Sequence, residues 1–117
     1  MNLDLFITRC NKINLSIDKQ CKIKTYLKIE EKFNFLNEYK ELVKNHMNDY
    51  PGFQSFTAFV IFNLLTVKYY TDIKLEMKFS EFDDLQENGL IDKIVEFIGQ
   101  DYSLLLRFVQ LEGNQIE

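Results

Sequence analysis

The sequence predicts a mainly α-helical fold, a compact bundle of four to five helices with a short N-terminal β-hairpin. Two patterns predict the helices. Apolar residues recur at spacings of three and four over 29–48, which builds the stripe of an amphipathic helix. Later helical stretches stop at Gly89, Gly99 and Gly113, where glycine commonly ends a helix. No proline-, glycine- or serine-rich linker divides the 117 residues, so a single helical domain over 1–117 is expected.

The N-terminal part of the chain carries two different patterns. Residues 2–11 fit a short amphipathic helix, because their apolar residues recur at helical spacing. Two alternating stretches then flank a polar turn at 18–20 and predict a two-stranded hairpin over 13–27. Because such a hairpin is marginal alone, we expect it to pack on the helix at 29–48.

A strong break separates the two long helices. The helix at 29–48 ends at residues 48–52, because Pro51 cannot continue a helix. The next helix is expected over 55–71, with Ser55 as its N-terminal cap. Its apolar residues cover nearly the whole circumference, which places it at the centre of the bundle or in an interface.

Three shorter helices are predicted to complete the bundle. Ser80 begins the first of them and Gly89 ends it, and the second spans 90–98. Asp101 caps the last helix, which stops at Gly113. The apolar face expected for this last helix consists of Leu104, Leu105, Phe108 and Leu111.

The composition points to contacts with other protein. The chain holds 11 Phe and 6 Tyr, and each buried ring removes about 150–250 Å² from water. A domain of this size is not expected to bury them all, and exposed aromatic side chains favour protein contacts. We predict that Phe53, Phe56, Tyr69 and Tyr70 contact a partner; packing in the core is the alternative for each.

The titratable residues form no catalytic or metal-binding pattern. A single histidine, His46, and two cysteines, Cys10 and Cys21, lack the spacing of a metal site, and the scattered glycines form no phosphate-binding loop. We therefore expect a protein that is not an enzyme and uses no metal or cofactor. The two thiols are expected to be free, in a reducing compartment.

The charge distribution bears on nucleic acids and membranes. The net charge is −4, and residues 59–117 hold eleven acidic side chains against five basic ones. This acidic half repels phosphate, so nucleic-acid binding is not expected. The most apolar stretch, 56–67, is shorter than the roughly 20 residues that span a bilayer, so no membrane contact is expected.

Three blocks of the sequence resemble a group of known proteins. They are Tyr26–Lys32, Asn63–Ile73 and Leu85–Ile94, about 28 of the 117 residues. Their order is similar to that in small helical bacteriophage proteins encoded among structural and assembly genes. The resemblance implies a helical protein that joins or assists a virion, and it implies no activity and no catalytic residues.

Two functional hypotheses follow. The first is a structural or assembly component of a phage particle, of the connector, tail or chaperone type, that binds itself or another virion protein. It would be found in the virion or the host cytoplasm. The alternative is a small acidic inhibitor of a host defence nuclease, whose carboxylates mimic phosphate. The residues expected on that acidic surface are Glu81, Asp83, Asp84, Glu87 and Asp92.

Overall fold

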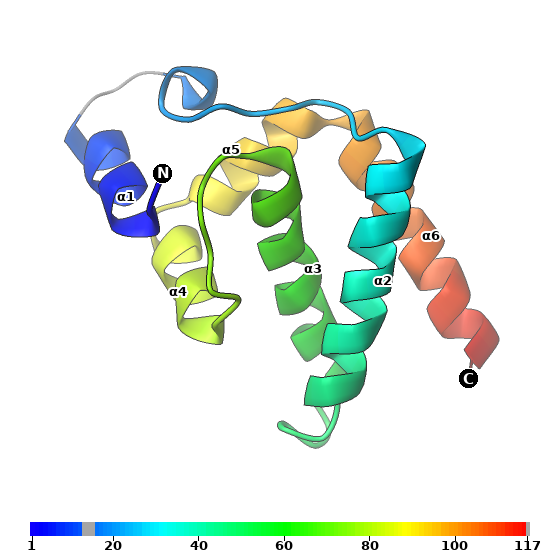
Figure 1. Cartoon of the computed structure of the whole chain (residues 1–117). Coiled ribbons are helices and arrows are strands. Elements are labelled where there is room, and N and C mark those ends of the chain that lie inside the picture. The colour runs from blue at the N-terminus through cyan, green and yellow to red at the C-terminus, as the bar shows by residue number, and fades with distance from the viewer. Residues whose placement is uncertain (13–15, 117) are drawn as a thin grey trace.

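The computed structural model describes residues 1–12 and 16–116, and the chain is helical over most of that length (Figure 1). The helices are α1 (Leu3–Lys12), η1 (Ile17–Lys19, a short 3-10 turn), α2 (Ile29–His46), α3 (Gln54–Tyr70), α4 (Phe79–Glu87), α5 (Leu90–Ile98) and α6 (Gln100–Ile116). The mainly helical prediction is confirmed. The described part contains six α-helices where four to five were predicted.

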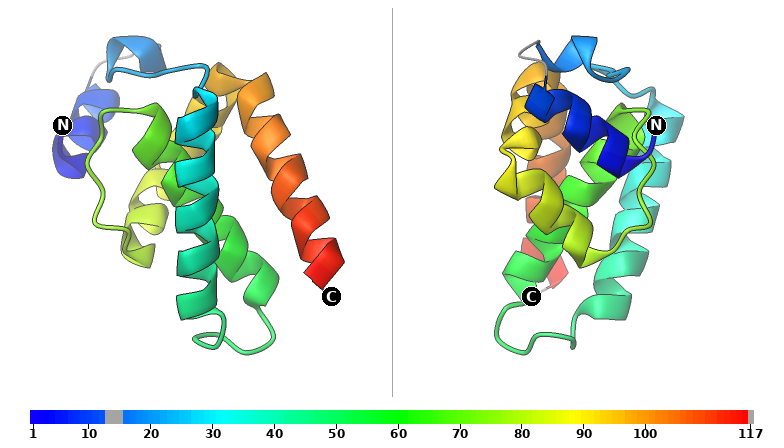
Figure 2. Two further views of the ribbon diagram at one scale, coloured as in Figure 1. Left: turned by 45° about the vertical axis from the view of Figure 1, so that its right-hand side comes forward. Right: turned by 90° about the vertical axis from the view of Figure 1, so that its left-hand side faces the viewer.

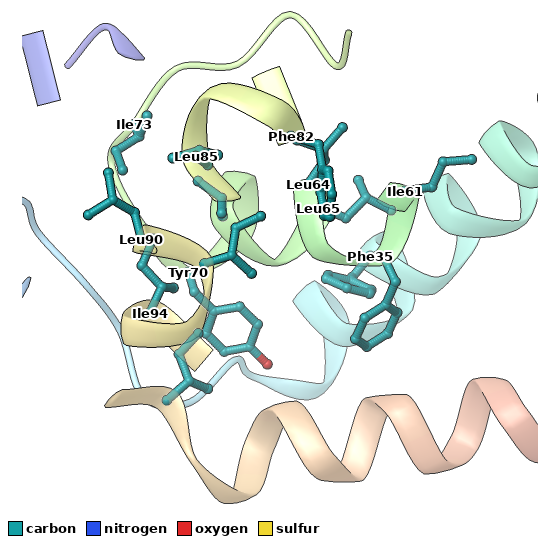
Figure 3. Packing of buried hydrophobic residues seen from close by; sticks show 14 of the residues in the cluster. Phe35, Ile61, Leu64, Leu65, Tyr70, Ile73, Phe82, Leu85, Leu90 and Ile94 are labelled. Carbon is teal, nitrogen blue, oxygen red and sulfur yellow. The ribbon is translucent and has the colours of Figure 1, made fainter. Parts of the chain in front are cut away.

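Helix α3 lies at the centre of the molecule, as its sequence predicted. It packs against α2, α4 and α5, and ten of its 17 residues are buried. Figure 3 shows Leu85 of α4 and Leu90 and Ile94 of α5 clustered beside α3, with Phe35 of α2 at the other side of the cluster. A helix that is apolar around most of its circumference can bury that surface only when neighbours cover several of its sides.

The predicted N-terminal hairpin is not formed. Residues 13–15 lie outside the described residues, 17–19 form η1, and the following segment runs extended across the end of the bundle. Its backbone pairs with the end of α3, since the amide of Lys24 donates to the carbonyl of Tyr70 at 2.7 Å and Ile23 forms an antiparallel bridge with Thr71. The two strands predicted from alternating side chains are therefore wrong: in the described residues this segment forms only an isolated bridge, with a distant part of the chain.

The connection between α3 and α4 also holds the start of the chain. The Met1 ammonium donates to the carbonyl of Asp72 at 2.9 Å, and the amide of Lys74 donates to the carbonyl of Met1 at 2.7 Å. These bonds dock α1 beside this connection, and its Phe6 is completely buried (Figure 1). The amphipathic helix predicted over 2–11 is therefore present as α1.

Two predicted helix starts are wrong by one residue. Ser55 is not the cap of α3, because the helix begins at Gln54 and the carbonyl of Phe53 accepts the amide and hydroxyl of Thr57 at 3.0 and 3.1 Å. Helix α4 begins one residue before Ser80, and the carboxylate of Glu81 accepts the amide of Lys78 at 2.8 Å.

The last helix departs furthest from prediction. Gly89 and Gly99 adopt positive φ angles of 67° and 70° and end α4 and α5 as predicted. Helix α6, however, begins at Gln100 and runs through Gly113 to Ile116. On its expected apolar face Leu105 is buried, whereas Leu104 and Phe108 are exposed; the side chain of Leu111 lies outside the described set. Beyond its first turns α6 diverges from α2 (Figure 2).

Candidate protein-binding surface

Six aromatic side chains gather around the turn between α2 and α3 and the start of α4. This aromatic cluster consists of Tyr50, Phe53, Phe56, Phe59, Phe79 and Phe82. Phe53 is 67% exposed, Phe56 59%, Tyr50 54% and Phe59 45%. At about 150–250 Å² per ring, these four leave on the order of 400 Å² of apolar surface in water. The largest apolar patch of a typical monomer measures about 300–600 Å² and is often functional.

The backbone explains why these rings are not buried. Gly52 has a φ of 86°, which lets the chain reverse direction immediately after Pro51. The amide of Phe53 then donates to the carbonyl of Tyr50 at 3.0 Å, and the Phe53 carbonyl accepts the first bonds of α3. Thr57 is the inward-facing residue of this first turn and is buried, so the rings before it are turned toward solvent.

The rings are ordered by contacts with one another. Phe56 and Phe59 stack with centroids 6.3 Å apart, and each meets Phe82 edge to face at 6.3 and 6.2 Å. Phe79 stacks on Tyr50 at 6.1 Å. Because Phe82 is itself buried, its contacts hold the exposed rings of Phe56 and Phe59 against the core between α3 and α4. A surface held rigid before binding loses less conformational entropy on association.

A hollow of about 260 Å³ opens within the aromatic cluster. Five of the six rings line it, all except Phe59, together with Thr57, Val60 and Asp83. Among the described residues that line it, Asp83 is the one that carries a charge. An apolar hollow with a carboxylate at its side can accept an apolar side chain that is flanked by a cation.

The five predicted acidic residues do not form one surface. Asp83, Asp84 and Glu87 are exposed on α4, and none has an ion-pair partner in the described part of the chain. Glu81 is half-buried and accepts the amides of residues 76 and 78 at 3.0 and 2.8 Å. Asp92 is exposed on α5. The carboxylates available to a ligand beside the aromatic cluster are therefore those of α4.

Of the four aromatic residues predicted to bind a partner, the structure brings together Phe53 and Phe56. Tyr69 is half-buried, donates its hydroxyl to Glu38 at 2.8 Å and packs on Phe35. Burial, together with the Glu38 carboxylate, raises the pKa of Tyr69 to about 12. Tyr70 is completely buried, which leaves it no surface for a partner.

Sequence reasoning missed the other members of the cluster. Phe79 and Phe82 reach it from α4, some 25 residues further along the chain, and only the tertiary fold brings them there. One local signal was present: Tyr50, Phe53, Phe56 and Phe59 stand at intervals of three across a strong helix break. Aromatic residues on both sides of a turn cannot all face the core, because the turn lies at the surface.

Sequence reasoning also missed a buried polar group at the other end of α3. We call this the buried junction; it consists of Leu27, Lys32, Tyr70 and Asp101. The Lys32 ammonium lies 3.0 Å from one carboxylate oxygen of Asp101 and also donates to the carbonyl of Leu27. The other carboxylate oxygen accepts the amide of Leu27 at 3.0 Å and the hydroxyl of Tyr70.

The Asp101 carboxylate of the buried junction is stabilised in its charged form by its partners within the chain. Burial alone would raise the pKa of Asp101, but the hydrogen bonds from Tyr70, Lys32 and Leu27 outweigh it and hold that pKa below its ordinary value. Burial and the Asp101 carboxylate raise the pKa of Tyr70 far above its ordinary range. The junction joins α2, α3 and α6. Because its polar groups are all paired with one another, it offers no free group for chemistry.

Cys10 and Cys21 belong to neither of the two regions, and His46 lies at the edge of the aromatic cluster. Burial, followed by nearby acidic groups, raises the pKa of Cys21 to about 12, so its thiol is protonated at neutral pH. Cys10 is half-buried and its pKa is also raised by burial. His46 pairs with Asp49 at 2.7 Å and lies against Phe79. Within residues 1–12 and 16–116, no three histidine, cysteine or acidic side chains converge as a metal site.

Comparison with known proteins gave no relative: no family model, no curated protein and no solved structure matches the chain. In the described residues, no helix combines the length and apolar character needed to cross a bilayer.

Proposed function

We propose that this chain is a non-enzymatic protein-binding module and that the aromatic cluster is its contact surface. The observation that supports the proposal is the gathering of six aromatic rings, four of them exposed, from the α2–α3 turn, α3 and α4, with five of the six lining one hollow. Aromatic side chains are enriched where protein interfaces bury their centres, and pockets there accept the anchor residues of a partner.

Covering the cluster would remove on the order of 400 Å² of apolar surface from water, which favours association. Part of that gain offsets the freedom that both partners lose on binding, so the packing of the rings and the charges around them decide the affinity. The carboxylates of Asp83 and Asp84 at the edge of the rings add selectivity for a basic partner.

The resemblance to small phage proteins supplies the biological setting of the proposal. We place the chain among the structural or assembly components of a phage particle, of the connector, tail or chaperone type. Its partner is then a virion protein, either another copy of this chain or a different one. Such a role needs a stable surface for docking and no reacting groups.

The proposal is tested by removing the rings. A double variant, Phe53→Ser with Phe56→Ser, is compared with wild type as tagged bait in extracts of cells that produce phage particles. The matched control is Phe97→Ser, which removes an exposed ring from α5, outside the cluster. Proteins held by wild type and Phe97→Ser but lost by the double variant support the proposal. Equal capture by all three proteins, each shown to be folded by circular dichroism, would overturn it.

The three unpaired carboxylates of α4 favour a second candidate, the acidic inhibitor of a host defence nuclease. Asp83, Asp84 and Glu87 lie on one exposed helix without cations beside them, which is the charge pattern that a phosphate-binding groove attracts. The discriminating variant reverses all three to Lys. Loss of nuclease inhibition, with the ring-dependent capture intact, would favour the inhibitor; unchanged inhibition would end the mimicry hypothesis.

A further inference from the structure

We propose that the partner bound by the aromatic cluster is a second copy of this chain, joined head to tail, with the cluster of one copy seated in a groove at the opposite end of the next. This inference rests on the proposed function and names its partner. It is carried by the position, the shape and the charge of the two surfaces.

The receiving groove lies beside the buried junction. Its volume is about 1130 Å³, and it opens between residues 25–26 and the corner where α5 meets α6. The apolar part of its wall comes from Tyr26, Val95, Ile98 and Leu104. Tyr26 is 64% exposed and Leu104 53%, so apolar surface is in water here too. The groove is larger than the roughly 300–1,000 Å³ of a small-molecule pocket, which is room for several side chains.

The two surfaces cannot meet within one molecule. The aromatic cluster lies where α2 ends and α3 begins, whereas residues 25–26 and Asp101 of the groove lie beside the start of α2 and the end of α3. These two pairs of helix ends are at opposite ends of the bundle (Figures 1 and 2). Helix α2 has 18 residues, so about 27 Å of helix separates them. Each copy therefore carries one exposed cluster and one open groove, pointing to different neighbours.

The charges of the two surfaces are opposite. Asp83 lines the hollow of the cluster, and Asp84 lies next to it on α4. At the groove, Arg107 lines the wall and has no ion-pair partner in the part of the chain that the structure describes, whereas Lys28, two residues beyond Tyr26, interacts with the Glu31 carboxylate. The groove's own carboxylate, Asp101, is neutralised by Lys32 at 3.0 Å. The acidic end of one copy thus fits the basic end of the next.

A two-fold dimer through the aromatic cluster alone is disfavoured by the same charges. In a two-fold interface the same surface of both copies is buried, so the α4 carboxylates of both copies would lie in one interface without a basic side chain from the groove. Like charges at such contacts weaken association. A head-to-tail contact avoids this repulsion, and it repeats to give a ring if the rotation closes or a filament if it does not.

The experiment uses two full-length variants that each block one end. Phe53→Asp places a charge in the cluster, and Leu104→Asp places one in the groove; both positions are exposed, so the fold is expected to survive. Light scattering coupled to size exclusion gives the mass of each protein across a concentration series. Wild type is expected to associate. Either variant alone is expected to associate with an affinity at least about thirty-fold lower, as for the loss of an interface anchor.

Mixing the two variants provides the decisive measurement. One retains an intact groove and the other an intact cluster, so an equimolar mixture is expected to form a discrete species of twice the 14.0 kDa chain mass and nothing larger. As a second pair that tests charge, Arg107→Glu is expected to weaken association, and combining it with Asp83→Lys on the other copy to restore it. Phe97→Ser is the folded control.

The outcomes separate this inference from the proposed function. A wild-type chain that stays monomeric at every concentration overturns the inference, while ring-dependent capture of a different protein would still support a binding module. Association of wild type without a dimer in the mixture shows a two-fold contact and also overturns it. Failure of both self-association and ring-dependent capture overturns the proposed function as well.

Discussion

The buried junction and the aromatic cluster lie at opposite ends of α3 and treat their side chains in opposite ways. At the junction, Lys32 and Asp101 are each less than a tenth exposed, and their polar atoms are paired within the chain. At the cluster, Phe53 and Phe56 are more than half exposed. A buried charge that is paired requires nothing from outside the molecule. Exposed rings around a hollow gain free energy only when something covers them, which is why we assign the proposed binding function to the cluster and not to the junction.

The largest effect on the free energy of unfolding is expected from a substitution that breaks the junction. Asp101→Ala leaves the ammonium of Lys32 buried without its carboxylate, and removing one partner of a buried ion pair typically costs about 3–5 kcal/mol. We expect a loss of this size in the free energy of unfolding, measured by urea denaturation. Asp83→Ala, which removes an exposed carboxylate from α4, is the control and is expected to change nothing measurable.

A paired replacement sharpens that result. Replacing both charges, Lys32→Met with Asp101→Leu, removes the ion pair without leaving a charge alone, and such exchanges are often neutral or stabilising. If the double variant is as unstable as Asp101→Ala, the junction contributes through its hydrogen bonds to Leu27 and Tyr70 more than through the charge pair.

The next effect is expected from Tyr70→Phe. This change removes one hydrogen bond to the Asp101 carboxylate and keeps the ring in the core. Hydrogen bonds to charged groups contribute about 1.5–3 kcal/mol, so the variant should lose roughly that much stability in urea. Tyr69→Phe is the matched control, since its hydroxyl bonds to Glu38 at a half-buried site. An equal loss for both variants would show that the junction is no stronger than a surface contact.

Lowering the pH is expected to reduce the contribution of the junction to the free energy of unfolding, by less than the substitutions above do. The pKa of Asp101 lies below its ordinary value of 3.8, so the folded chain holds its charged form more firmly than the unfolded chain does. This contribution to stability is present above pH 3.8 and is lost as the pH falls through the folded-state pKa. Between wild type and Asp101→Asn, the free energies of unfolding should therefore converge as the pH is lowered through that window. Curves that stay parallel would contradict the assigned role of the carboxylate.

The sequence allowed the helices to be predicted better than their contacts. The periodicity of 29–48 and the glycines at 89 and 99 are local signals, and they gave α2, α4 and α5 nearly as observed. The hairpin failed because alternation in residues 23–27 indicates an extended segment without indicating what it pairs with, and here it pairs with the end of α3. No local pattern shows which segment will accept a backbone hydrogen bond.

The same limit applies to the two regions. Asp101 has the position of a helix cap in the sequence, yet it lies within α6 and pairs with Lys32, 69 residues earlier. Phe53 and Phe56 were predicted as contacts beside Tyr69 and Tyr70, which the sequence cannot distinguish from them because all four flank or lie in one apolar helix. Their different exposure comes from tertiary contacts: Phe35 of α2 packs on Tyr69 and Asp101 of α6 bonds to Tyr70, whereas Phe53 and Phe56 stay more than half exposed.

The smallest effect on stability should come from Phe53→Ser, and it tests the comparison most directly. Phe53 is the most exposed large apolar residue of the cluster, so its removal should change the free energy of unfolding by no more than about 0.5 kcal/mol. Phe35→Ala, which removes a completely buried ring, should by contrast cost about 3–5 kcal/mol. The same Phe53→Ser protein should lose its self-association or its ring-dependent capture. A residue that contributes nothing to folding and much to binding is what distinguishes a contact surface from an incompletely covered core; a large loss of stability in Phe53→Ser would show the cluster to be the latter.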